Sequence, residues 1–349
     1  MAADAVDIGD DARVGGVGVR RGELLLSVRH ADVTIPTGGS SSTDVRAVVD
    51  VSVDIHRGER VALVGESGAG KSMLARSIIK LLPSKAVQSQ RSTYNFDGVD
   101  LSQLAQSEII AYRGRRISMI FQDPLTYLNP TRTVGSQIAE TFRPKLPRAE
   151  RRARVADALL DVGLSQANME RRYPHELSGG MRQRVLIAMA LASGADLLIA
   201  DEPTTALDVT VQHQILHLVH RAVLDHNMAL LLITHDLGVV AGVCDWVYVM
   251  YQGPVVESAD IDTIFSAPAH PYTQTLLASS RRDVAAVAPT EEREPIGDDA
   301  CPYAGRCQYV HEACLTRPPM RSDEFGRGAS CWLFEPDGQS NELERITRR

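Results

Sequence analysis

In a chain of 349 residues, 44% hydrophobic and 23% charged residues are the proportions of a globular protein that can bury a large core. The formal net charge of −7 excludes a general attraction to nucleic acid, which we do not expect as a partner. The most apolar long stretch, residues 185–200, is interrupted by Ser193, Gly194 and Asp196, so no membrane-spanning segment is expected. Residues 1–22 lack the basic and apolar parts of a secretory signal, which predicts a disordered tail on a cytoplasmic protein.

A strand, a glycine-rich turn and a helix are predicted in succession over residues 59–82. The apolar run 59–64 precedes Gly65-Glu66-Ser67-Gly68-Ala69-Gly70-Lys71-Ser72, and a helical pattern follows over 71–82. In such a loop, backbone N–H groups and the lysine bind phosphate oxygens, and the final serine binds Mg²⁺. An ordinary glycine turn is the alternative, which the flanking elements disfavour. The residues predicted to contact a nucleotide here are Gly65, Glu66, Ser67, Gly68, Ala69, Gly70, Lys71, Ser72 and Met73.

A helix-rich insert lies between Gln122 and the next predicted strand. Within residues 150–163 the apolar positions recur on one helical face. These positions are Val155, Ala158, Leu159 and Val162. We interpret the insert as a helical subdomain.

The apolar run 197–200 is typical of a buried parallel strand and leads directly into Asp201 and Glu202. On its own, such a pair is more often a solvated strand end. Downstream of a phosphate-binding loop, however, Asp201 is predicted to hold Mg²⁺ and Glu202 to orient and deprotonate the attacking water.

A helical stretch over 209–225 and another apolar run over 229–234 complete the predicted sheet. Short apolar strands that alternate with helices predict an α/β fold with helices on both faces of a parallel sheet. No internal repeat is evident.

The sequence Leu-Ser-Gly-Gly-Met over residues 177–181 lies just ahead of Asp201 and opens a helix. A serine hydroxyl, glycine backbone and helix N-terminus form a second phosphate-binding surface. In isolation, a simple Ser-Gly-Gly helix cap is an equally good interpretation.

Together these motifs resemble the ABC ATPase family over residues 23–265. The resemblance implies a P-loop NTPase core with an antiparallel β subdomain and a helical subdomain, and hydrolysis of ATP with Mg²⁺. It implies that Gln122 in FQDP is the Q-loop residue, which joins Ser72 and Asp201 around Mg²⁺, and that His235 is a catalytic switch histidine. It also implies that two motifs serve the nucleotide of an opposite subunit: the signature, with Ser178, Gly179 and Gly180, and the D-loop Leu207-Asp208, with Asp208.

Four segments narrow the resemblance to ATPases of oligopeptide, dipeptide and nickel importers. They are FQDPLTYLNP, RYPHELSGGMRQR, ITHDLGVV and HPYT, the last over residues 270–273. Met181 replaces the glutamine of general ABC signatures, and this branch often has methionine there. The partners implied are a second ATPase subunit, identical or related, two membrane permease subunits and an external substrate-binding protein. The place implied is peripheral, at the cytoplasmic face of the cell membrane.

Peptide is the cargo that this branch favours, with nickel or another small solute as alternatives. A non-transport ABC ATPase acting on ribosomes or DNA fits less well, because only one set of motifs is present and about 130 residues separate Lys71 from Asp201. A degenerate regulatory subunit is disfavoured by the intact Lys71, Glu202 and His235.

Many ABC ATPases stack adenine on an aromatic side chain ahead of the second strand, but residues 35–48 contain none. Ile35 or Val45 is expected to supply apolar contact instead, with less stacking energy. GTP therefore remains an alternative to ATP.

Four of the five cysteines crowd into residues 266–349, a proline-rich and charged C-terminal extension. Their spacing lacks the close pairs of structural zinc sites and leaves the ligand open. The segment CPYAGRCQYVHEAC resembles the extension of peptide-importer ATPases, which implies a [4Fe–4S] cluster; zinc and unligated thiols are the alternatives. The predicted ligands are Cys301, Cys307, Cys314 and Cys331, whereas Cys244 is expected to be a buried small hydrophobe.

Overall fold

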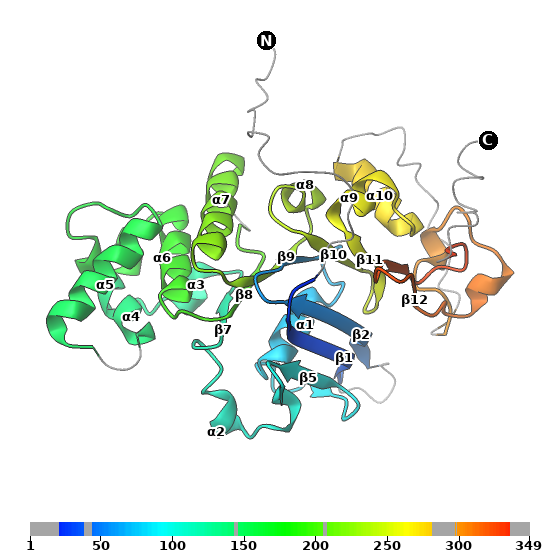
Figure 1. The fold of residues 1–349 in the computed structure, drawn as a ribbon, viewed down its shortest axis with the longest axis horizontal. Helices are drawn as coiled ribbons and strands as arrows, with labels where there is room; N and C mark the ends of the chain where they lie inside the picture. Colours follow the sequence, from blue (N-terminus) through cyan, green and yellow to red (C-terminus); the bar gives the residue numbers. More distant parts are fainter. Residues whose placement is uncertain are drawn as a thin grey trace, which may run out of the picture.

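The structure is a computed structural model and describes residues 21–37, 44–142, 146–204, 208–280, 297 and 299–335. Two β-sheets pack against each other, with helices at the outer face of the larger sheet (Figure 1). The predicted tail therefore lies almost wholly outside the described residues. Among the described helices, none has both the length and the apolar character needed to cross a bilayer.

The smaller sheet is antiparallel, with strand order β2-β1-β5-β6, and β4 pairs with β1. Its strands are β1 (Leu24–Ile35), β2 (Val45–His56), β4 (Val87–Gln88), β5 (Thr93–Phe96) and β6 (Val99–Asp100). This sheet is the antiparallel β subdomain that the family resemblance implies.

The larger sheet has the order β12-β13-β11-β10-β3-β9-β8-β7. Its five strands from β10 to β7 are parallel, and the rest are antiparallel. The strands are β3 (Arg60–Val64), β7 (Ile117–Ile120), β8 (Leu197–Asp201), β9 (Ala229–Thr234), β10 (Trp246–Met250), β11 (Val255–Asp260), β12 (Arg321–Ser322) and β13 (Gly328–Ala329). Both faces of the parallel strands are covered, which explains why the sequence shows continuous apolar runs there.

Side chains alternate along β3 between two hydrophobic cores. Val61 and Leu63 join the core between the two sheets, whereas Ala62 and Val64 join the core under the outer helices. Strand β8 divides its residues in the same way. This two-sided burial holds the carboxyl ends of β3, β8 and β9 in register at one edge of the sheet.

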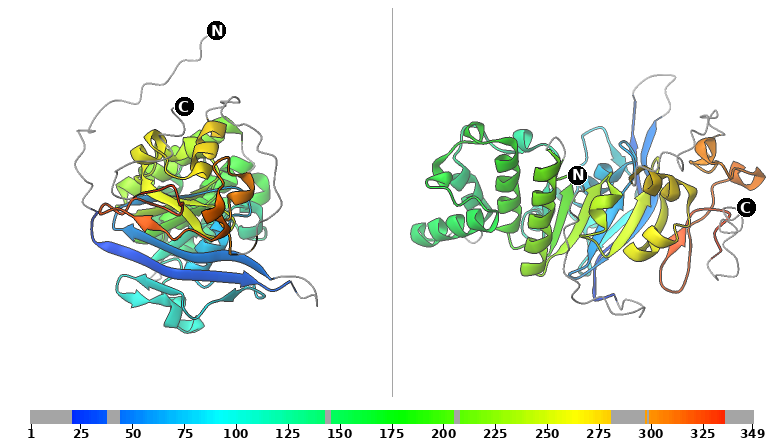
Figure 2. Two further views of the ribbon diagram at one scale, coloured as in Figure 1. Left: turned by 90° about the vertical axis from the view of Figure 1, so that its right-hand side faces the viewer. Right: turned by 90° about the horizontal axis from the view of Figure 1, so that it is seen from above.

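The α-helices are α1 (Lys71–Ile78), α2 (Gln106–Ile109), α3 (Pro124–Tyr127), α4 (Val134–Thr141), α5 (Arg148–Asp161), α6 (Gly179–Leu191), α7 (Val209–Asp225), α8 (Leu237–Val240), α9 (Ile261–Ser266) and α10 (Pro271–Ser280). Short 3₁₀ turns cover Leu101–Gln103, Met169–Arg171, Pro174–Glu176, Ala304–Arg306 and Glu312–Leu315. Helices α3 to α6 form the predicted helical subdomain at one end of the molecule, and the four apolar positions predicted to share a face are buried (Figure 2).

The helix predicted over 71–82 is four residues too long, because α1 ends at Ile78. Lys80 adopts a left-handed backbone conformation with φ of 52°, and Pro83 follows. A proline disfavours helical geometry in the residue before it, so the apolar pattern beyond Ile79 belongs to a turn.

The described part of the C-terminal extension packs against the ATPase core at the end opposite the helical subdomain (Figure 2). Strand β13 pairs with β11 and so lengthens the larger sheet, and both Tyr303 and Cys307 belong to the core under the outer helices. The sequence predicts a separate extension because proline and charge increase after residue 265. The boundary at residue 265 remains a prediction.

Candidate nucleotide-binding and hydrolysis site

The glycine-rich loop over residues 65–72, here called the P-loop, joins β3 to α1. Gly65 and Gly70 have positive φ values of 155° and 101°, in the left-handed region. A Cβ atom on Gly65 would lie 2.2 Å from the Met250 carbonyl oxygen, and one on Gly70 would lie 1.9 Å from the Ala47 carbonyl oxygen. Side chains at these positions are therefore excluded both by backbone conformation and by contact with neighbouring strands.

Lys71 is the first residue of α1 and is buried. Its Nζ atom donates to the carbonyl oxygens of Gly65 at 2.8 Å and of Glu66 at 2.9 Å. Burial lowers the pKa of Lys71, and the carboxylates of Glu202, Asp201 and Glu66 oppose that effect. The ammonium is thus held inside the P-loop, where the phosphates of a nucleotide can exchange for the two carbonyl groups.

Ser72 and Asp201 meet at the carboxyl end of β8. The Ser72 hydroxyl donates to Asp201 Oδ1 at 2.7 Å. Asp201 Oδ2 is buried and has no hydrogen-bond partner within the described residues. Burial raises the pKa of Asp201, while Ser72 and Arg76 lower it. A hydroxyl beside a buried carboxylate with an unused oxygen fits the oxygen donors that Mg²⁺ requires.

Glu202 has a φ of 45°, which is uncommon for a residue with a side chain, and its N–H donates to the Ile233 carbonyl of β9 at 3.0 Å. Gln122 Nε2 donates to Glu202 Oε2 at 3.0 Å. His235 Nδ1 lies 3.7 Å from Glu202 Oε1, and its side chain is largely exposed. The tertiary structure therefore brings the predicted base, the Q-loop residue and the switch histidine together around one carboxylate.

The signature and D-loop residues begin two helices. The Ser178 hydroxyl accepts a hydrogen bond from the Met181 N–H at 3.3 Å at the start of α6, and Asp208 caps α7 by accepting one from Val211 N–H at 3.0 Å. Ser178, Gly179 and Asp208 are exposed, and no hydrogen bond within the described residues joins the signature to the P-loop. Leu207, the other predicted D-loop residue, lies outside the described residues.

Comparison with known proteins places this geometry in a family. A family model described as ABC transporter matches residues 48–205, and one described as oligopeptide/dipeptide transporter, C-terminal region, matches residues 256–314. The oligopeptide transport ATP-binding protein AppD of Bacillus subtilis is 42% identical over 307 residues, which are 84% of this chain and 93% of AppD. The chain belongs to the ATP-binding subunits of oligopeptide and dipeptide ABC transporters.

Other members of this family are equally similar. The dipeptide transport ATP-binding protein DppD of Bacillus subtilis is 43% identical over 89% of this chain and 95% of its own length. The oligopeptide transport ATP-binding protein OppD of Salmonella typhimurium is 42% identical over 90% of this chain and 94% of its own length. A dimeric structure of the bacterial ABC transporter cassette MJ0796 aligns with a TM-score of 0.60 and 26% identity over 68% of this chain and 99% of the cassette.

In this ATP-binding subunit the four C-terminal cysteines line one cavity together with His270, Pro271 and Tyr303. Burial raises the pKa of Cys331 to about 12, and the other three thiols add to that effect. None of the chain's five cysteines, all in described segments, forms a disulfide. Within those segments no three His, Cys, Asp or Glu side chains are grouped closely enough to hold a metal ion. Cys244 is buried elsewhere, as expected.

Ile35 and Val45, the residues expected near a nucleotide base, are cross-strand partners at the open end of β1 and β2. Two residues further along β2, Ala47 lies against Gly70 of the P-loop. Val45 is therefore two residues from the contact between β2 and the P-loop. The apolar contact of Ile35 or Val45 with the base of a nucleotide remains a prediction.

Two contacts of the P-loop were not predicted from sequence. Arg306 Nη1 lies 3.0 Å from both carboxylate oxygens of Glu66, and the Glu66 N–H donates to the Tyr272 hydroxyl at 2.9 Å. Tyr272 lies in the HPYT segment, which the sequence marks as typical of the family but without a role. Arg306 carries no such signal, because it lies 240 positions from Glu66.

Proposed function

We propose that this chain is the subunit that hydrolyses ATP to power an importer of oligopeptides or dipeptides. The observation that carries the proposal is the assembly of Ser72, Asp201, Gln122 and Glu202 beside the P-loop. The names of the relatives support peptide as the cargo.

In the proposed mechanism, N–H groups of the P-loop and the start of α1 bind the phosphates, and Lys71 balances their charge. Ser72 and Asp201 would hold Mg²⁺, and the bound ion would supply positive charge to offset the charge that develops on the phosphate oxygens. Glu202 accepts a proton from the attacking water, and Gln122 orients the Glu202 carboxylate through the bond at 3.0 Å. His235, also beside Glu202, completes the site.

We infer that two such subunits close head to tail on two ATP molecules, with Ser178, Gly179, Gly180 and Asp208 of one facing the nucleotide of the other. The exposure of Ser178 and Gly179 at the start of α6 supports this arrangement, because a helix N-terminus attracts phosphate. The aligned cassette MJ0796, which has the same fold, forms a dimer in its solved structure.

A membrane permease subunit is proposed to dock in a groove of ≈ 620 Å³ beside the Q-loop. The groove lies between α2 and the helical subdomain, and its lining includes Leu81, Ile110, Phe121, Tyr127 and Met189. Ile110 is 61% exposed although it is strongly apolar. An exposed apolar groove of this kind fits the apolar face of an amphipathic helix.

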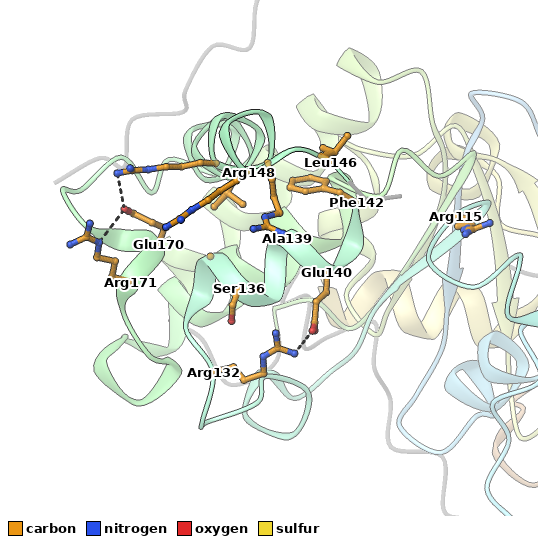
Figure 3. Close-up of a pocket in the computed structure, with 14 residues that line it drawn as sticks. Arg115, Arg132, Ser136, Ala139, Glu140, Phe142, Leu146, Arg148, Glu170 and Arg171 are labelled. Carbon is orange, nitrogen blue, oxygen red and sulfur yellow. Dashed lines mark hydrogen bonds and ion pairs between the residues drawn. The ribbon is translucent and has the colours of Figure 1, made fainter. Parts of the chain in front are cut away.

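A basic pocket of ≈ 1140 Å³ continues from this groove, since both are lined by Arg115 and Glu140 (Figure 3). Glu140 pairs with Arg132, and Glu170 lies 3.8 Å from Arg171. Six arginines but only two glutamates line the pocket, in a chain whose net charge is −7. The excess positive charge fits acidic residues that flank the docked permease helix. This docking would place the subunit at the cytoplasmic face of the membrane.

The docking surface can be tested with the permeases and the external binding protein in proteoliposomes. ATP hydrolysis should rise when the binding protein carries a peptide, and Ile110→Glu should remove that rise, because it places a charge in the apolar groove. Phosphate release measures the rate of ATP hydrolysis with and without peptide, in the parent chain and in Ile110→Glu. Leu160→Glu is the matched control, since Leu160 is 63% exposed on α5 and does not line the groove. Stimulation by nickel but not by peptide would contradict the proposed cargo, and an unchanged response of Ile110→Glu would contradict the docking site.

We further propose that Cys301, Cys307, Cys314 and Cys331 hold a [4Fe–4S] cluster. Their convergence on one cavity supplies the four thiolates that the cluster needs. In the described residues no three metal-binding side chains are grouped around one point, and this holds for a cluster and for a single zinc ion alike, so metal analysis decides between them. The bound cluster would supply a structural cross-link for an extension with little core of its own.

Anaerobic purification should give a brown protein with about four iron and four sulfide per chain. Replacing any one of the four cysteines by serine should lower the iron content, because each thiolate is a ligand, whereas Cys244→Ser should not. Metal analysis and sulfide determination check this. ATP hydrolysis should persist at least in part. One zinc per colourless chain would establish the alternative metal, and a metal-free chain with four alkylatable thiols would contradict both.

A further inference from the structure

Glu66, in the P-loop, is held from two sides by the C-terminal part of the chain. Arg306 Nη1 contacts both oxygens of its carboxylate at 3.0 Å, and the Tyr272 hydroxyl accepts a hydrogen bond from its N–H at 2.9 Å. The Tyr251 hydroxyl also faces the Arg306 guanidinium. The P-loop is therefore packed directly against the extension.

Arg306 and Tyr272 are also neighbours in sequence of residues that line the cavity of the four cysteines. Arg306 ends a 3₁₀ turn and immediately precedes Cys307. Tyr272 follows His270 and Pro271, which line that cavity themselves. Two short routes thus connect the thiols to one residue of the nucleotide site.

Both routes run through tightly fixed groups. The buried Glu257 carboxylate accepts hydrogen bonds from the N–H groups of Ala269 at 2.7 Å and His270 at 2.9 Å, which anchors the start of α10. Tyr303 packs against Tyr272 with ring centroids 5.5 Å apart. A shift of the cysteine-bearing turn must therefore be accommodated by Tyr272 and Arg306, since close-packed groups transmit displacement.

Stability alone does not account for the ion pair. The side chains of Arg306 and Glu66 are 34% and 45% exposed, and pairs with that exposure contribute little to the free energy of unfolding. The Glu66 carbonyl, however, also accepts a hydrogen bond from Lys71 Nζ. When phosphates compete for Lys71, the backbone of Glu66 must respond, and Arg306 and Tyr272 hold that residue.

We propose that Arg306 and Tyr272 are positioning residues that couple the four-cysteine cavity to the P-loop, so that nucleotide binding and the ligation or modification of the thiols affect each other. A nucleotide orders the P-loop, which fixes Glu66 and restrains the turn that carries Cys307. Binding therefore protects the thiols, and by reciprocity loss or modification of their ligation weakens nucleotide binding by the same factor. The nucleotide half of this coupling rests on the proposed function; the thiol half does not depend on which metal is bound.

The test uses the full chain, Mg²⁺ and a non-hydrolysable ATP analogue. Maleimide labelling of each cysteine is followed by mass spectrometry, with the buried Cys244 as the internal reference. The analogue should slow labelling of the four C-terminal cysteines about fivefold or more. In Arg306→Gln the ratio should fall to about one at equal thermal stability, and Arg306→Lys should restore part of it because the charge returns.

Arg327→Gln is the matched control, because Arg327 belongs to the same extension but pairs with Asp260 at 3.0 Å instead of with the P-loop. It should keep the full protection. In preparations that contain iron, the rate of iron release to a chelator should follow the same pattern. The dissociation constant of the analogue, measured on chains labelled at the four thiols, should also rise, because the coupling acts in both directions.

Three outcomes separate the hypotheses. Binding of the analogue without protection of the thiols, or full protection in Arg306→Gln, would overturn the coupling alone. A chain without iron would refute the cluster, while protection against maleimide would still support the coupling. A chain that does not bind the analogue would contradict the proposed function and the coupling together.

Discussion

Replacing Glu202 by glutamine should lower the rate of ATP hydrolysis by a factor of at least about 100, because the amide cannot accept a proton from the attacking water. Nucleotide binding should remain, since the P-loop, Ser72 and Asp201 are unchanged. The hydrogen bond from Gln122 to the Oε2 position can also be kept, because the amide oxygen of glutamine accepts it. The variant should therefore bind ATP and accumulate a closed dimer.

Phosphate release gives the turnover of this variant, and a fluorescent ATP analogue gives its affinity. Gel filtration with and without ATP reports the dimer. Glu150→Gln is a suitable control, because Glu150 lies on α5 and pairs with Arg154 on the same helix. Hydrolysis by Glu202→Gln at nearly the parent rate would show that another group is the base.

Replacing Ser178 by arginine should abolish ATP-driven dimer formation and leave ATP affinity of the monomer almost unchanged. The long cationic side chain would occupy the exposed start of α6, where the nucleotide of the opposite subunit is proposed to bind. The loss of the helix cap costs about 1 kcal/mol, so only a small fall in melting temperature is expected. Ser178→Arg is best combined with Glu202→Gln, because Glu202→Gln alone is expected to accumulate the closed dimer.

Sedimentation at increasing ATP concentration measures closure of this double variant, and equilibrium binding measures monomer affinity. Ser279→Arg serves as the control, because Ser279 is also exposed on a helix but belongs to no nucleotide motif. If Ser178→Arg lowers monomer affinity strongly, the signature contacts its own nucleotide and the head-to-tail arrangement is wrong.

Local rules account for the parts of the site that could be predicted. The P-loop needs glycine where φ is positive, and the apolar runs 197–200 and 229–234 show strands buried on both faces, so the sequence alone predicts where the phosphates and Glu202 belong. The helix predicted after the P-loop is too long, because apolar spacing continues past Ile78 while Lys80 and Pro83 end the helical backbone.

Contacts between distant segments were decided by the tertiary structure. Ser72 and Asp201 are 129 positions apart and meet only because β3, β9 and β8 are neighbours in one parallel sheet. Family resemblance supplied that pairing, but neither resemblance nor periodicity indicated that Arg306 would reach Glu66.

The sequence by itself determined the chemistry of this protein: a phosphate-binding loop, a carboxylate pair after a buried strand, and four clustered thiols. Each depends on residue type and on backbone conformation over a few neighbouring positions, which short-range sterics and hydrogen bonding impose. Only the tertiary structure decided that the thiols share one cavity, that the extension lengthens the sheet, and that Arg306 of the extension contacts Glu66 of the P-loop. Those contacts depend on how whole elements pack, and packing is set by shape and burial across the entire chain rather than by any local pattern.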